Sequence, residues 1–157
     1  MNNHSFINSK WLKITTKQKL YDPFVNDWYA LIESSEKALF YKIFKNSFGY
    51  EDFLHKTPTS LLVYIITFRT RNHRLPIEIG NWDRIPINER LCQTCNRLGD
   101  KFHYLFECTI YDRERKQYLK RYYYNNHITF KLQKLMSSKK DFINLCKFCK
   151  TILSNNR

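Results

Sequence analysis

The stretch RLCQTCNRLGDKFHYLFEC, from Arg90 to Cys108, holds three of the five cysteines of this chain. Its spacing is C-x2-C-x7-H-x4-C, formed by Cys92, Cys95, His103 and Cys108. Two cysteines separated by two residues can grip one metal ion from a single tight turn, and the histidine and the last cysteine complete four ligands. Three sulfurs and one nitrogen are typical of a structural zinc site. The stretch therefore predicts one structural Zn²⁺ ion.

Other residues of the stretch support this geometry. Gly99 suits a chain reversal, and Asp100 suits the N-cap of a short helix that carries His103 and ends at Cys108. A catalytic zinc keeps one position open for water, so four protein ligands disfavour it. We expect Glu107 to face solvent or a neighbouring arginine rather than to act as a general base. The alternative is four residues that are simply buried close together.

Cys146 and Cys149 repeat the spacing of two cysteines separated by two residues. No second pair lies nearby in the sequence, and Cys149 falls on the apolar stripe of a predicted helix. Disulfide redox chemistry would favour a pair at the start of a helix, where the dipole lowers a thiol pKa. We therefore interpret both residues as core thiols.

The composition predicts the fold class. With 157 residues, 43% of them hydrophobic and 17% aromatic, the chain can bury one real core. Glycine and proline are scarce, at 3 and 4 residues, which disfavours an all-β protein rich in tight turns. We expect a mainly α protein, a small helical domain with one Cys-Cys-His-Cys zinc-knuckle-like insertion and little or no sheet. The expected organisation is an irregular N-terminal segment at 1–21 and a single helical domain at 22–157, with the zinc motif at 90–108.

Capping signals and periodicity place the expected elements. One helix is predicted to have Asp22 as its N-cap and Pro23 as its first residue. A second, buried helix is predicted to have Thr57 as its N-cap and Pro58 as its first residue. The segment EKALFYKIFKNSF fits a helix, with a strand left open. Residues 74–90 are expected to form an ordered loop. Two further helices are predicted at 109–126 and at 141–153, the latter with its stripe formed by Phe142, Leu145, Cys149 and Ile152.

The charge points to a polyanionic partner. Lysine and arginine number 27 against 14 acidic residues, a net charge of +13. Such a field attracts nucleic acid first and an anionic membrane surface second, although an AT-rich genome also enriches lysine. The candidate nucleic-acid face comprises Arg69, Arg71, Arg74, Arg84, Arg90 and Arg97. The alternative is that some of these arginines cap a helix or pair with Glu78 and Glu89.

The run YLKRYYYNNH interleaves tyrosines with Lys120 and Arg121. Exposed tyrosines beside cations can stack single-stranded bases. Packing of these rings in the core is the favoured reading, because a tyrosine-rich helix end commonly buries its rings and exposes its hydroxyls.

The sequence also suggests a compartment. Its start lacks an apolar signal core, and the longest apolar run, LLVYIITF, is too short to span a membrane. An odd number of cysteines disfavours a disulfide framework. We expect an intracellular protein of the nucleus or cytoplasm, without a membrane association or a small-molecule substrate.

Three stretches carry a resemblance to a known family. FRTRNHRLPIEIGNW, the zinc motif and RKQYLKRYYY together resemble the C-terminal region of reverse transcriptases from animal non-LTR (LINE-type) retrotransposons, over roughly residues 28–150. In that region a Cys-Cys-His-Cys zinc motif follows the polymerase thumb. The resemblance implies a module that helps a retrotransposon protein hold its RNA template or target DNA.

The expected function follows from the resemblance and from what the chain lacks. A polymerase needs paired aspartates that hold two metal ions, and no two aspartates are adjacent here. We therefore expect a non-catalytic, zinc-stabilised nucleic-acid-binding module that resembles the tail of a larger ancestor, encoded alone. The alternatives are a structural zinc module that binds another protein, such as a retrotransposon polymerase, a metal-dependent hydrolase, or a decayed fragment without function.

Overall fold

The computed structural model describes residues 9–35, 38–43, 45 and 47–156. Its contacts divide the chain into two units, Met1–Glu36 and Lys37–Arg157. The structure is mostly helical, as the composition predicted, and the described residues contain no strand. One isolated antiparallel bridge joins Leu91 to Leu98 inside the cysteine motif.

The first unit contains helix α1, Ser9–Ser34. The prediction of an irregular segment at 1–21 is therefore wrong for residues 9–21, while residues 1–8 lie outside the described residues. The predicted start at Asp22 is also wrong, because Pro23 lies inside the helix. Residues 9–22 contain no glycine or proline and several lysines and leucines, which favour a helix over this stretch. The division between the units falls after Glu36 instead of after residue 21.

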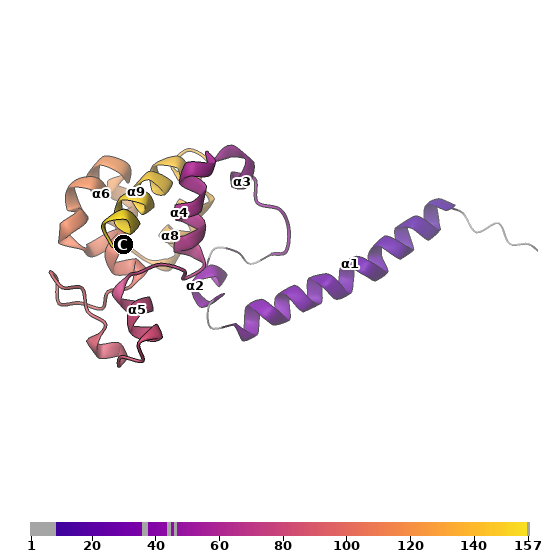
Figure 1. Ribbon diagram of the computed structural model, residues 1–157. Helices are drawn as coiled ribbons and strands as arrows, with labels where there is room; N and C mark the ends of the chain where they lie inside the picture. Colours follow the sequence, from indigo (N-terminus) through magenta and orange to yellow (C-terminus); the bar gives the residue numbers. More distant parts are fainter. Residues whose placement is uncertain (1–8, 36–37, 44, 46, 157) are drawn as a thin grey trace, which may run out of the picture. The chain divides into compact units, whose positions relative to one another are not determined.

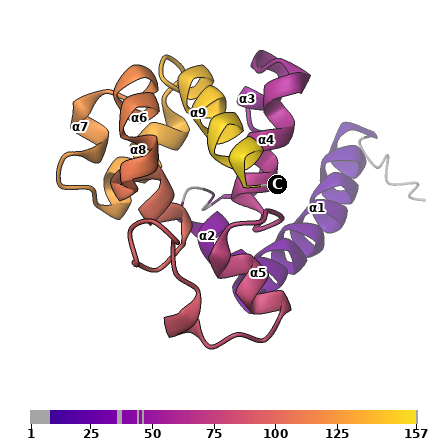
Figure 2. The same cartoon turned by 60° about the vertical axis from the view of Figure 1, so that its left-hand side comes forward.

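The second unit consists of short helical elements (Figure 1, Figure 2). In chain order they are α2 (Leu39–Lys42), α3 (Phe53–Lys56), α4 (Thr59–Arg69), α5 (Pro76–Trp82), the 3-10 turn η2 (Ile87–Glu89), the π-turn η3 (His103–Glu107), the 3-10 turn η4 (Thr109–Tyr111), α6 (Asp112–Tyr118), α7 (Arg121–Tyr124), α8 (Thr129–Ser137) and α9 (Phe142–Asn155).

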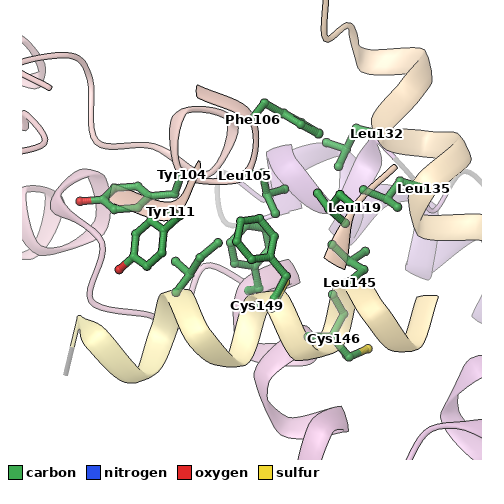
Figure 3. Close-up of a cluster of buried hydrophobic side chains, with 14 of the residues drawn as sticks. Tyr104, Leu105, Phe106, Tyr111, Leu119, Leu132, Leu135, Leu145, Cys146 and Cys149 are labelled. Atoms are coloured by element: carbon green, nitrogen blue, oxygen red, sulfur yellow. The ribbon is translucent and has the colours of Figure 1, made fainter. Parts of the chain in front are cut away.

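Helix α9 lies at the centre of the core. It packs chiefly against α4 and also against α6 and α8. Its predicted apolar stripe is confirmed, since all four stripe residues are buried. Cys149, a member of this stripe, and Cys146 are both fully buried, as the core-thiol interpretation requires (Figure 3). Burial raises the pKa of Cys146 to about 12, which keeps it a neutral thiol.

The predicted loop at 74–90 is partly helical, which corrects the sequence interpretation. Pro76 is the first residue of α5, where its missing N–H needs no partner and its fixed φ suits a helix. Pro76 therefore starts a helix and does not mark a loop. The predicted start of the buried helix is one residue too early. Pro58 is the N-cap of α4, and Thr59 is its first helical residue.

The predicted helix at 109–126 is broken. Leu119 and Lys120 are extended and separate α6 from α7. The break allows Leu119 and Tyr123, both 4% exposed, to enter the core. Helix α8 was not predicted, and it adds Leu132 and Leu135 to the same core (Figure 3).

Candidate metal centre

The first two cysteines lie on a tight hairpin-like turn, which we call the knuckle, residues 91–98. The Cys92 N–H donates to the carbonyl of Arg97 at 2.7 Å, and the Asn96 N–H donates to the carbonyl of Cys92 at 2.9 Å. Asn96 has φ of +50°, a left-handed conformation that asparagine tolerates better than most residues. The turn therefore presents both sulfurs to the same side.

The other two ligands depend on an unusual turn. In an α-helix, residues five apart face about 140° away from each other. The segment His103–Glu107 is instead a π-turn, closed by the Cys108 N–H donating to the carbonyl of His103 at 2.7 Å. Its wider turn brings residues five apart closer to one face. Asp100 caps the start of the turn as predicted, since its Oδ1 accepts from the His103 N–H at 2.8 Å.

The four ligand atoms converge with the spacing of a tetrahedron. All four lie within 4.8 Å of one another. The Sγ of Cys108 is 3.8 Å from the Sγ of both Cys92 and Cys95. With Zn–S bonds of about 2.3 Å, tetrahedral geometry places neighbouring sulfurs about 3.8 Å apart. The separation is far too long for a disulfide, which needs about 2.0 Å, and it fits a metal-bound set.

The surroundings of the ligands also fit a bound cation. His103 is 3% exposed, and burial lowers its pKa, so the ring is held in the neutral form that binds metals. Among the described residues neither ring nitrogen makes a hydrogen bond of good geometry, and the nearest carboxylate oxygen, Glu107 Oε2, lies 3.5 Å from Nδ1. Burial raises the pKa of Cys108 to about 12, and a bound dication would reverse this by stabilising the thiolate. A hydrogen bond with the Thr109 hydroxyl lowers the pKa of Cys95.

The carboxylate of Glu107 contacts one candidate ligand and two neighbouring basic side chains. Its Oε2 lies 2.8 Å from Arg97 Nη1 and 3.5 Å from His103 Nδ1, and its Oε1 lies 3.1 Å from His127 Nε2. The prediction that Glu107 faces an arginine is therefore confirmed. A carboxylate beside one nitrogen of a ligand histidine is the usual device that orients the ring and leaves the other nitrogen for the metal.

Arg115 is the residue that sequence reasoning missed. Its side chain is 2% exposed. Its Nε and Nη2 donate to the carbonyls of Leu105, Tyr104 and Cys108 at 2.8, 3.3 and 2.7 Å. The guanidinium thus satisfies carbonyl groups in and beside the π-turn that carries two ligands. No motif signals this role, because Arg115 lies among charged residues that suggest a solvent-exposed helix.

The candidate nucleic-acid arginines are not one surface. Arg69 is 3% exposed, pairs with Glu51 at 2.7 Å and lies over the ring of Phe53. Arg71 pairs at 2.7 Å with Glu78, which is itself buried. The assignment of Arg69 to an exposed face is therefore wrong, and the alternative of pairing with Glu78 is confirmed for Arg71. Both arginines hold the end of α4 in place.

The other four candidates differ in their contacts. Arg90 donates to the carbonyls of Ile85 and Ile77 at 2.8 and 3.2 Å, so it closes the loop before the knuckle. Arg97 is largely exposed but is paired with Glu107. Arg74 and Arg84 are exposed, and no described residue forms an ion pair with either.

Most tyrosines of the run YLKRYYYNNH pack against the core, as the packing interpretation predicted, and one is exposed. Tyr123 is buried, and its hydroxyl donates to Asp141 at 2.7 Å. Tyr118 and Tyr124 are half-buried against the core. Tyr122 is the exposed member, with Lys131 and Lys134 near its ring.

Comparisons with protein-family models, curated proteins and solved structures found no match to this chain. None of the described helices combines the length and the apolar character that a bilayer-spanning helix requires.

Proposed function

We propose that this chain is a non-catalytic nucleic-acid-binding module stabilised by one structural zinc ion. The observation that carries the zinc assignment is the 3.8 Å separation of Cys108 Sγ from the two other sulfurs, beside a buried histidine whose Nε2 has no hydrogen-bond partner among the described residues. Cys92, Cys95, His103 and Cys108 would hold the ion. Zinc would supply cross-linking and charge neutralisation at this place, since four protein ligands leave no position for a reacting water.

The nucleic-acid part of the proposal rests on charge. A net charge of +13 on 157 residues favours association with polyanions. The resemblance to the zinc-binding tail of non-LTR retrotransposon reverse transcriptases points the same way, toward an RNA template or a DNA target. With Arg69 and Arg71 engaged in the fold, the accessible cations of the described region include Arg74, Arg84 and Arg113.

Metal analysis of the purified protein tests the zinc assignment. We expect one zinc ion per chain, lost in Cys92→Ser and Cys108→Ser. The matched control is the double variant Cys146→Ala and Cys149→Ala, which alters the second cysteine pair and should retain one zinc. Folded wild-type protein without zinc would overturn the assignment, and a halved content in the control would indicate a second site.

Binding of the zinc-loaded chain to labelled single-stranded RNA, single-stranded DNA and duplex DNA tests the partner. The logarithm of the affinity should fall linearly with the logarithm of the salt concentration, because phosphate contacts release counterions. Absence of binding to all three at low salt would reject the nucleic-acid proposal while leaving the zinc assignment intact.

A further inference from the structure

A groove lies beside the knuckle, and one of its lining residues, Cys92, belongs to the candidate zinc site. Its volume is about 600 Å³, within the range of small-molecule sites. The segment around α5, the knuckle, the turn η4 and the last residues of α9 all contribute to its walls. We call it the knuckle groove and define it by Arg74, Gln93, Thr94, Ile110, Asn155 and Asn156.

The groove is lined by an exposed cation, Arg74. Arg74 is exposed, and it forms no ion pair with the described residues. Arg90 also lines the groove, but its donors go to the backbone carbonyls of Ile85 and Ile77. Glu89 is the one carboxylate among the described lining residues. A guanidinium that lines a groove and forms no ion pair with the described residues suits a phosphate, which it can bind through two parallel hydrogen bonds.

The remaining lining offers both flat apolar surface and amide groups. Pro76, Ile79 and Ile110 contribute apolar walls, while Gln93 and Asn155 contribute exposed amide side chains. An amide presents a donor and an acceptor together, the combination that pairs with the edge of a nucleic-acid base. Apolar walls with a few amides and one cation match a nucleotide better than they match a purely apolar ligand.

We infer that the knuckle groove binds one unpaired nucleotide of a single strand, with the base between the apolar walls and the phosphate on Arg74. This inference rests on the proposed nucleic-acid function and specifies its site. A duplex keeps its bases stacked and paired, so a groove of this size can take a base only from a single strand, loop or end. The zinc ion has an indirect part, since it holds the turn that carries Gln93 and Thr94.

The test compares variants of the zinc-loaded full chain for binding to a short labelled single-stranded RNA and to the same sequence as a duplex. Arg74→Ala should weaken single-strand binding on the order of 10-fold, as expected for a charged hydrogen bond, and reduce the salt slope by about 0.7. Arg113→Ala is the matched control, since it removes the same charge from an exposed site on α6 outside the groove. Its effect should be clearly smaller.

A second variant fills the groove without removing charge. Gln93→Trp places a bulky ring at an exposed position of the knuckle, so it should keep one zinc and the wild-type melting temperature while losing single-strand binding. Photo-crosslinking of a thiouridine-substituted strand should label residues of the groove.

Failure of the groove inference and failure of the proposed nucleic-acid function give different results. Equal weakening by Arg74→Ala and Arg113→Ala, or crosslinks that map elsewhere, would overturn the groove while the wild-type protein still binds. Equal affinity for strand and duplex with the same dependence on Arg74 would also overturn it. No binding by the wild-type protein would reject the underlying function instead.

Discussion

Arg115 shows how one buried side chain shapes the metal centre. Its guanidinium donates to three carbonyls in and beside the π-turn, and Asp112 lies 3.3 Å from its Nη1. Lysine has no planar fork and cannot serve several separated carbonyls at once. We expect Arg115→Lys to cost about 3 kcal/mol of unfolding free energy and to weaken zinc binding. Urea unfolding and metal analysis check this, with the exposed Arg113→Lys as the control, which should leave both unchanged.

Glu107 lies beside His103, one of the four candidate metal ligands. Removing its charge while keeping its shape, in Glu107→Gln, should weaken zinc affinity by about 10-fold, as is typical when the partner of a ligand histidine is altered. Competition with a chromophoric chelator measures the affinity. Glu89→Gln removes an equal charge from an exposed position and serves as the control. Equal affinities in the two variants would contradict an orienting role for Glu107.

His73 makes the stability of the second unit depend on pH. Its ring is 4% exposed, its Nδ1 accepts from the Leu75 N–H at 3.3 Å, and burial lowers its pKa to about 3. The unfolded chain binds a proton near pH 6.5 while the folded chain does not, so stability is full above pH 6.5 and is lost as the pH falls toward 3. The expected loss between pH 7 and pH 5 is about 2 kcal/mol.

The variant His73→Asn isolates this contribution. Asparagine can still accept from the backbone N–H two residues ahead but does not titrate. Protonation of the zinc ligands affects both proteins equally, so the difference between their unfolding free energies reports on His73. That difference should shrink as the pH falls from 7 to 5. A constant difference over this range would show that His73 does not titrate on unfolding.

At the scale of elements, Gly99, the residue directly after the knuckle, contacts α5. The Ile77 N–H donates to the Gly99 carbonyl at 3.2 Å. A Cβ at Gly99 would lie 2.7 Å from the Cβ and Cγ of Pro76, a rigid ring that cannot move aside easily. We expect Gly99→Ala to cost about 1–3 kcal/mol, the usual penalty of overpacking. Thermal unfolding measures the effect, and Gln93→Ala, at an exposed site of the same turn, should be close to neutral.

At the scale of the whole second unit, the metal centre and the helical core are continuous. Leu105 and Phe106, between the two ligands of the π-turn, pack in one cluster with Leu119, Leu132 and Leu135 (Figure 3). Structural zinc contributes on the order of 10 kcal/mol to small domains. Chelation should therefore unfold the unit cooperatively, with loss of helical circular dichroism and a lower melting temperature. Unfolding limited to the knuckle, with the helical signal retained, would contradict this expectation.

The sequence by itself determined the features that depend on neighbours along the chain. The ligand set lies within 17 residues, so its spacing alone indicates a metal site. The Asp100 cap and the stripe of α9 also follow from local rules, because capping and helical periodicity involve residues three or four positions apart. Scarcity of glycine and proline predicted the helical class.

Only the tertiary structure decided the roles of residues whose partners are distant in the sequence. Arg69 pairs with Glu51 eighteen residues away, and Arg115 reaches carbonyls up to eleven residues away. A run of arginines looks the same in sequence whether it faces solvent or satisfies buried acids and carbonyls. The break at Leu119 likewise follows from what the core can bury. Charge and period are local properties, whereas burial is set by the packing of all elements together. Burial separates Arg69, which supports the fold, from Arg74, which is exposed.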